Sequence, residues 1–290
     1  MIACPLRFKR PLVLACFLII YVAFSSYASF PASTEIDKQR INEVLKQAYE
    51  LDQKYRRIID SLMKAEIYNE ELAVAAYEMK EQDKRNIELV LPIIDSIIHY
   101  RIDDLDTLSY KACYLVIQHA DVDIHNKYVD FVHHLAQKGY IPSLNYAWFV
   151  DRLLVGQGKV QKYGVQAYRY INNVTLLYPV GIDYLESWNE LGLEFDPKIW
   201  DNCKYSPALV SPNEFALLGF ILHNSEGAEG IKVQVNESIH TLTTSTGYFC
   251  LVFNKVLIPD SIQIVTSSAT VDYKLDIAED ADFIVVTYDL

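Results

Sequence analysis

The amino-acid sequence predicts an α+β protein of two parts, a mostly α-helical N-terminal domain followed by a small C-terminal all-β sandwich. Up to about residue 200, apolar residues recur every three or four positions, which is the period of one helix face. Beyond residue 212, short β-rich runs alternate with glycine and proline. The chain has 290 residues, of which 51% are hydrophobic and 22% charged, so it can bury the core of one domain or two.

The N-terminus has the three parts of a secretory signal peptide: a basic start, an apolar run over residues 11–24, and small residues before Ser29. The run is shorter than the roughly 20 residues that span a bilayer. We therefore expect a signal peptide over residues 1–28 and an extracytoplasmic protein, either periplasmic or secreted. The alternative is an uncleaved segment that anchors the chain in the membrane. Cleavage of a lipoprotein type before Cys16 would leave a very short apolar stretch.

Five helices are expected in the first part of the chain. The second contains Pro92, which can kink or divide it. Gly139 ends the fourth, because glycine often follows the last turn of a helix. The expected helices cover residues 34–64, 70–100, 107–120, 122–137 and 143–155. Together they predict a helical domain over residues 34–200.

A loop rich in proline, serine and asparagine, residues 201–212, is expected to link this domain to the second part. In residues 213–290, β-branched and aromatic runs are separated by glycines and Pro259. The runs cover residues 215–222, 231–235, 241–244, 248–253, 261–266, 270–275 and 283–288. Several short strands in so few residues predict a small β-sandwich.

The charge of the chain bears on its partners. The formal net charge is −12, and removal of residues 1–28 takes away three positive charges and no negative one. An acidic chain without a basic patch is not expected to bind nucleic acid, whose phosphates require clustered lysine and arginine. The expected partner is a small polar ligand or an envelope component, and membrane contact is expected only through an uncleaved signal segment.

Cysteine and histidine spacing gives no metal signal, and we expect no cofactor. Cys113, Cys203 and Cys250 are odd in number and lack CxxC spacing, so any disulfide pairing stays open. The stretch QHADVDIH, residues 118–125, offers two histidines and two aspartates. At about 100° per residue, however, Asp121 and His125 share one helix face while Asp123 lies on another, and HExxH spacing is absent. Hydrogen-bonded or solvated histidines are the alternative to a metal site.

Asp151 lies in the segment SLNYAWFVDRLLV, which is apolar on nearly every side and should be buried. A buried carboxylate is costly unless it is paired or well hydrogen-bonded. Asp151 therefore either locks the fold through an ion pair or lines a pocket and acts on a ligand.

The stretch VGQGKVQKYGVQ follows directly, at residues 155–166. It lacks the GxxxxGK[ST] spacing of a phosphate loop. Its glycines permit a tight backbone, and its glutamines and Tyr163 both donate and accept hydrogen bonds. Such a set suits either a polar, neutral ligand or internal bracing of the loop, and the residues alone favour bracing.

Five blocks in a fixed order resemble a bacterial family catalogued as domain of unknown function 6624. They are DQKYR at 52–56, DKRN at 83–86, YLVIQHAD at 114–121, FVDR at 149–152 and GKVQKYGVQ at 158–166. The resemblance spans residues 40–200 and brings no known activity. It implies that the polar residues of these blocks form one pocket. Its candidate catalytic residues are His119, Asp121 and Asp151, and its candidate ligand-binding residues are Arg152, Gln161, Tyr163, Gly164 and Gln166.

The sequence departs from that family pattern in places. Val165 stands where the family has threonine, which puts any hydroxyl-dependent step in doubt, and His125 stands roughly where glutamine is frequent. A second resemblance lies further on: GFILHNSEGAEGIKVQVNES and TTSTGYFCLVF are similar to the carboxypeptidase regulatory-like (transthyretin-like) sandwich. Modules of that family are accessory domains of exported bacterial proteins, so the resemblance implies a fold and hardly a function.

Two functions therefore stay open. One is an exported helical domain that holds a small polar ligand; an enzymatic version would use His119 as a general acid or base oriented by a carboxylate. The other is a non-catalytic envelope or surface interaction protein whose polar residues only brace the helices. Because the sequence has no GxSxG motif or cysteine–histidine signature, it does not favour a covalent hydrolase.

Overall fold

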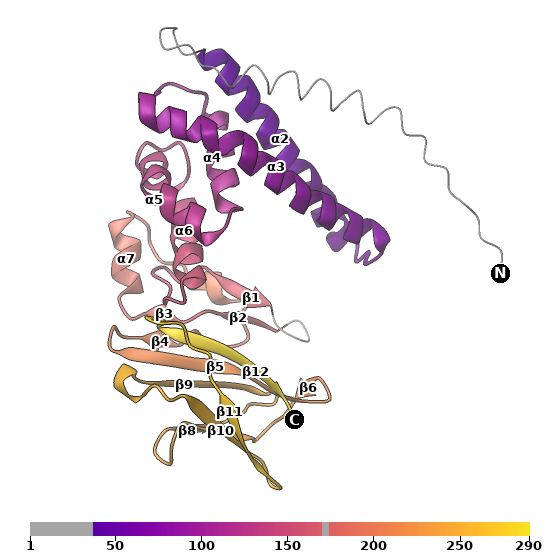
Figure 1. Cartoon of the computed structure of the whole chain (residues 1–290), viewed down its shortest axis with the longest axis vertical. Helices are drawn as coiled ribbons and strands as arrows, with labels where there is room; N and C mark the ends of the chain where they lie inside the picture. Colours follow the sequence, from indigo (N-terminus) through magenta and orange to yellow (C-terminus); the bar gives the residue numbers. More distant parts are fainter. Residues whose placement is uncertain (1–36, 170–173) are drawn as a thin grey trace, which may run out of the picture. The chain divides into compact units, whose positions relative to one another are not determined.

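The computed structural model describes residues 37–169 and 174–290, and the predicted signal peptide lies outside them. It confirms the α+β architecture, with helices in the N-terminal half and a sheet-rich C-terminal part (Figure 1). The chain divides into a unit of residues 1–40 and a compact unit of residues 41–290, which contains all the elements described below except the first three residues of the first helix. No helix among the described residues reaches the length and apolarity of a membrane span.

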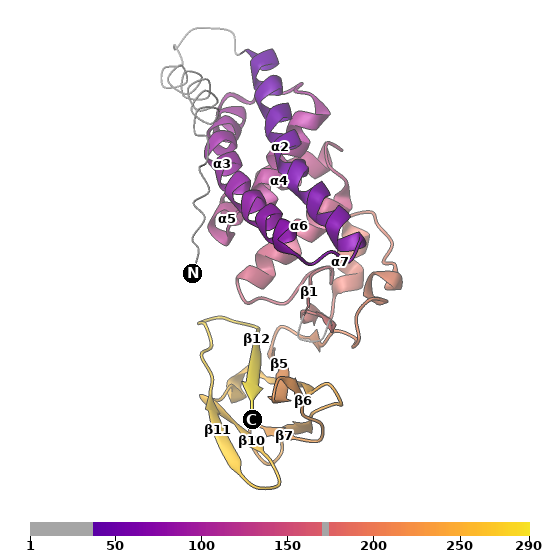
Figure 2. The ribbon, with the colours of Figure 1, turned by 90° about the vertical axis from the view of Figure 1, so that its right-hand side faces the viewer.

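The first two helices form a hairpin. Helices α2 (Lys38–Lys64) and α3 (Glu70–Tyr100) lie side by side in both views (Figures 1 and 2). The side chain of Asn69 caps α3 by accepting a hydrogen bond from the N–H of Leu72. Pro92 lies inside α3, which continues past it to its predicted end.

Three shorter helices follow, namely α4 (Thr107–Gln118), α5 (Val122–Gln137) and α6 (Ser143–Gly156). Helix α4 ends two residues earlier than predicted, because His119 is its C-cap and Asp121 is already the N-cap of α5. The carboxylate of Asp121 accepts a hydrogen bond from the N–H of Ile124 (3.0 Å), as an N-cap residue should. The QHAD motif is therefore a helix-to-helix corner.

Short elements that the sequence did not predict connect the helices to the sandwich. Strands β1 (Ala167–Arg169) and β2 (Thr175–Leu177) pair antiparallel, and β3 (Val180–Gly181) pairs parallel with β4 (Leu209–Val210). Helix α7 (Tyr184–Glu190) and a 3-10 helix (Pro197–Trp200) lie between β3 and β4. The predicted linker thus contributes a strand.

All seven predicted runs form strands, and together with an unpredicted two-residue strand, β6, they build two four-stranded sheets. One sheet has the order β11-β10-β7-β8. In the other, β5 pairs in parallel with β12 and antiparallel with β6 and β9. The strands are β5 (Glu214–His223), β6 (Glu226–Gly227), β7 (Lys232–Gln234), β8 (His240–Leu242), β9 (Tyr248–Asn254), β10 (Ser261–Val265), β11 (Thr270–Lys274) and β12 (Phe283–Asp289).

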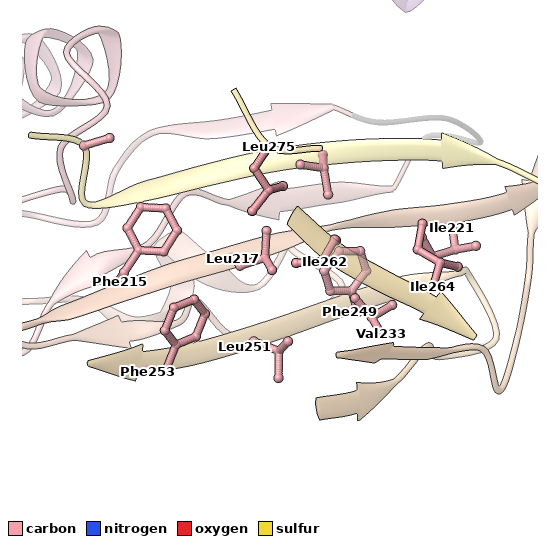
Figure 3. Close-up of a cluster of buried hydrophobic side chains, with 12 residues drawn as sticks. Phe215, Leu217, Ile221, Val233, Phe249, Leu251, Phe253, Ile262, Ile264 and Leu275 are labelled. Carbon is pink, nitrogen blue, oxygen red and sulfur yellow. The ribbon is translucent and has the colours of Figure 1, made fainter. Parts of the chain in front are cut away.

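Apolar side chains of both sheets meet in the sandwich core, where Phe215, Leu217 and Phe249 lie among aliphatic neighbours (Figure 3). Strand β5 is buried on its other face as well. There Ala216 and Leu218 pack in a cluster with residues from the segment between α6 and β4. This explains why β5 reads as a continuous apolar run rather than an alternating one, and it joins the sandwich to the loop after α6.

Candidate functional site

A buried carboxylate organises the loop that follows α6. Asp151 is fully buried in the third turn of that helix. Its Oδ1 accepts hydrogen bonds from the backbone N–H groups of Lys162 (2.7 Å) and Tyr163 (2.9 Å), and its Oδ2 accepts one from Val165 (2.9 Å). Asp151 takes part in no ion pair among the described residues. Backbone dipoles, and not a cation, therefore stabilise this carboxylate.

The glutamine side chains of the loop form hydrogen bonds with backbone groups of the same chain. Gln161 is fully buried; its Nε2 donates to the carbonyl of Tyr178 (2.7 Å), and its Oε1 accepts from the N–H of Gln166. The side chain of Gln166 in turn donates to the carbonyl of Trp148 on α6 (3.0 Å). These contacts fold the loop onto the helix that precedes it.

Tyr163 and Gly164 complete the loop through their backbone carbonyls. Trp188 Nε1 donates to the carbonyl of Tyr163 (2.8 Å), and Trp200 Nε1 donates to that of Gly164 (2.9 Å). Gly164 has a positive φ of 74°, and a Cβ there would lie 3.2 Å from the Trp200 ring. Both the backbone conformation and the space therefore favour glycine at this position. We refer to Asp151 with residues 161–166 as the Asp151 loop.

The side chain of Arg152 reaches the end of α4 and not the Asp151 loop. Successive residues of a helix project about 100° apart, and the Nη1 of Arg152 donates to the backbone carbonyl of Gln118 at the end of α4 (2.9 Å). Arg152 belongs to no ion pair in the described part of the chain. Burial lowers its pKa, and the nearby Arg56 charge lowers it further, but a guanidinium keeps its charge at neutral pH.

His119 lies among charged side chains from the first two helices. The Nε2 of His119 is 3.9 Å from Oδ1 of Asp52, which is almost completely buried on α2. Arg56, one turn further along α2, is bound to Asp52 through Nε (3.3 Å) and to Asp83 of α3 through Nη2 (2.7 Å). Together with Arg152, these residues form what we call the His119 cluster: Asp52, Arg56, Asp83, His119 and Arg152.

The electrostatics of the cluster keep His119 neutral. Burial is the largest cause that lowers the pKa of His119, to about 4, and the positive charges of Arg56 and Arg152 lower it further, while Asp52 opposes them. The side chain is nevertheless 20% exposed. Burial also raises the pKa of Asp83, against the attraction of Arg56. At neutral pH the unprotonated imidazole can accept a hydrogen bond from a bound molecule.

Two buried polar atoms next to the cluster have no hydrogen-bond partner among residues 37–169 and 174–290. They are Oε1 of Gln118 and Nε2 of His125, whose side chains are 7% and 3% exposed. Burial lowers the pKa of His125, as does the charge of Arg152, so its ring is also neutral near pH 7. Buried polar atoms are normally satisfied, and each exception needs an explanation.

The structure therefore divides the predicted site residues into two groups. His119 and Arg152 come together, whereas Asp151, Gln161, Tyr163, Gly164 and Gln166 form the Asp151 loop. Asp121 is exposed and caps α5. No group of three or more histidine, cysteine, aspartate or glutamate side chains within residues 37–169 and 174–290 could hold a metal ion. The three cysteines of these ranges, Cys113, Cys203 and Cys250, are free thiols.

Sequence reasoning left Asp52, Arg56 and Asp83 out of the candidate site. A signal for them was present, because Asp52 and Arg56 are one helical turn apart in DQKYR and Asp83 opens DKRN. A carboxylate and an arginine at that spacing are also frequent on solvated helix faces. Only the packing of α2 against α3 distinguishes the two cases.

Comparisons with known proteins find no match for this chain. No protein-family model matches the chain, and no curated protein matches it.

Proposed function

We propose that this chain is an exported bacterial protein whose helical part binds a small polar ligand at the His119 cluster, with the β-sandwich as an accessory module. The observation that carries the proposal is the meeting of ionisable side chains from α2, α3 and α6 with a partly exposed, neutral histidine at the α4–α5 corner. Charged groups gathered in partly buried surroundings, with shifted pKa values, are typical of functional sites.

Several features support a ligand at this place. Arg152, the second cation of the cluster, donates to a backbone carbonyl and takes part in no ion pair among the described residues. The unpartnered Oε1 of Gln118 offers a hydrogen-bond acceptor beside the cluster. The resemblance to domain of unknown function 6624 is consistent with this proposal, since four of its five blocks supply the residues of the His119 cluster. In an enzymatic form of the proposal, His119 would act as a proton acceptor held by Asp52.

The Asp151 loop has a different part in this proposal. Its buried polar side chains bind backbone groups of the same chain, so we assign it to bracing and not to ligand contact. In the alternative function, a non-catalytic envelope or surface interaction protein, the residues of the His119 cluster also only brace the helices. The ion pairs that Arg56 makes with Asp52 and Asp83 favour that alternative.

A thermal-shift screen separates the two functions. The purified protein and its His119→Ala variant are melted alone and with a panel of small polar compounds. If the His119 cluster binds a ligand, at least one compound should raise the melting temperature of the wild type but not that of the variant, because a ligand stabilises the state it binds. It also predicts that the variant alone melts at or above the wild-type temperature at pH 7.

The control is Gln161→Ala, which should melt lower than the wild type but keep a response to the compound, although a weaker one. If no compound shifts the melting temperature of the wild type and His119→Ala melts several degrees lower, the bracing alternative is correct.

Export is tested separately by N-terminal sequencing of the protein from an envelope or medium fraction. A start near Ser29 supports a cleaved signal peptide.

A further inference from the structure

The His119 cluster contains two arginines and two aspartates, but among the described residues both aspartates pair with the same arginine, Arg56. Arg56 binds both Asp52 (3.3 Å) and Asp83 (2.7 Å), so the two carboxylates of the cluster are already engaged. Arg152 has a hydrogen bond to the carbonyl of Gln118 and no ion pair among the described residues. A partly buried guanidinium without a counter-charge is costly to the folded state. Something other than stability is therefore expected to explain its position.

Arg152 lies near a second guanidinium group. Burial lowers the pKa of Arg152, the charge of Arg56 lowers it further, and the phenol of Tyr114 opposes them. His119 is neutral near pH 7 and adds no negative charge. Because the charge of Arg56 is already paired with Asp52 and Asp83, the attraction for a negative group is expected to come mainly from Arg152 itself.

The guanidinium also has the free donors that such a group needs. An arginine carries five N–H donors in a planar fork, and the structure engages one nitrogen, Nη1, with the carbonyl of Gln118. The fork matches the spacing of two oxygens of a carboxylate or phosphate. Arg152 is of intermediate exposure, as are His119 and Arg56, so a small molecule can reach it from solvent.

From these observations we propose that the ligand of the His119 cluster carries an anionic oxygen group, a carboxylate or a phosphate, that binds the guanidinium of Arg152. The inference rests on the proposed function and adds the chemical class of the ligand. His119 would then face the remainder of the molecule and accept a hydrogen bond from it.

The test measures melting temperatures of wild type, Arg152→Gln and Arg152→Lys. The probes are inorganic phosphate, succinate and neutral glucose, with ionic strength matched by sodium chloride. Phosphate or succinate should raise the wild-type melting temperature by roughly 5–10 °C at a hundredfold excess over Kd. The Gln variant should lose the shift, and the Lys variant, which keeps the charge but not the fork, should keep part of it. If only phosphate or only succinate raises the melting temperature, that result identifies which anionic group binds.

Without ligand, Arg152→Gln should melt at or above the wild-type temperature, because it removes an uncompensated charge. The matched control is Arg57→Gln, an arginine that is 62% exposed and paired with Glu50; it should keep the anion response. If Arg152→Gln melts several degrees lower, Arg152 is structural and the inference is wrong. The inference also fails if neither anion exceeds sodium chloride. In that case, a melting-temperature shift with glucose that His119→Ala removes would still support the proposed function. If none of the probes shifts the melting temperature, both the proposed function and this inference are overturned.

Discussion

Asp151 and His119 are expected to make opposite contributions to the pH dependence of stability. Burial raises the pKa of Asp151 to about 6, against the hydrogen bonds from the N–H groups of the loop. Burial and nearby arginines lower the pKa of His119 to about 4. We therefore predict that Asp151→Asn and His119→Gln change the pH dependence in opposite directions between pH 4 and 7.

The sign follows from which state holds the proton more tightly. Folded Asp151 holds its proton more tightly than the unfolded chain does, so its contribution is fully present below about pH 4 and is lost as the pH rises through 6. Folded His119 holds its proton less tightly, so its contribution is present above about pH 6.5 and is lost as the pH falls towards 4. At 1.36 kcal/mol per pKa unit, each contribution is about 3 kcal/mol, and in the wild type the two nearly cancel.

The assay is urea unfolding followed by tryptophan fluorescence at several pH values, with the wild-type unfolding free energy subtracted from that of each variant. The signal reports on the relevant region, since Trp188 and Trp200 both donate hydrogen bonds to the Asp151 loop. From pH 4 to 7 the difference should rise by about 3 kcal/mol for Asp151→Asn and fall by about as much for His119→Gln. A falling difference for Asp151→Asn would refute the reasoning, because the three N–H donors would then outweigh burial.

Three further predictions concern single hydrogen bonds and one backbone conformation. Gln161→Ala leaves the N–H of Gln166 and a carbonyl unpaired in a buried place, so calorimetry should show a loss of about 2–4 kcal/mol and a clearly lower melting temperature. Gly164→Ala should cost at least about 1–2 kcal/mol in urea unfolding, because its φ is 74° and the Trp200 ring is close. Asp121→Ala removes the cap of α5 and should cost about 1 kcal/mol in the same assay, without changing any ligand response.

The long elements of the fold could be predicted because each carries a period that the sequence displays. Helix α3 was predicted with the bounds it has, and Pro92 did not divide it. The segment between α6 and β4 carries no such signal. Strands β1 to β4 are two or three residues long and α7 is seven, so they are too short to display a period of two or 3.6. Long-range contacts determine them instead: β1, β2 and β4 pack against the outer face of β5, and α7 packs against α6 and the Asp151 loop.

The candidate site was harder to predict for the same reason. The helical pattern showed that Asp151 would be buried, but not that its partners would be the N–H groups of Lys162, Tyr163 and Val165. The ordered blocks put His119 and Arg152 in one group, and the structure places them near each other. The same blocks contained Asp52 and Asp83, whose roles depend on the packing of α2 and α3, which no local pattern reveals.

Asp151 and Arg152 show why bracing and binding need not be alternatives for this chain. They are neighbours on α6, and their side chains reach two different places, the loop after the helix and the end of α4. The Asp151 loop holds α6 through Asp151 and through the bond from Gln166 to Trp148, and a helix held in this way keeps its other faces in place. On our proposals, the loop determines where Arg152 stands relative to His119, while Arg152 meets the ligand. Loosening the loop should therefore weaken the response to anions without abolishing it, whereas Arg152→Gln should abolish the response without loosening the loop.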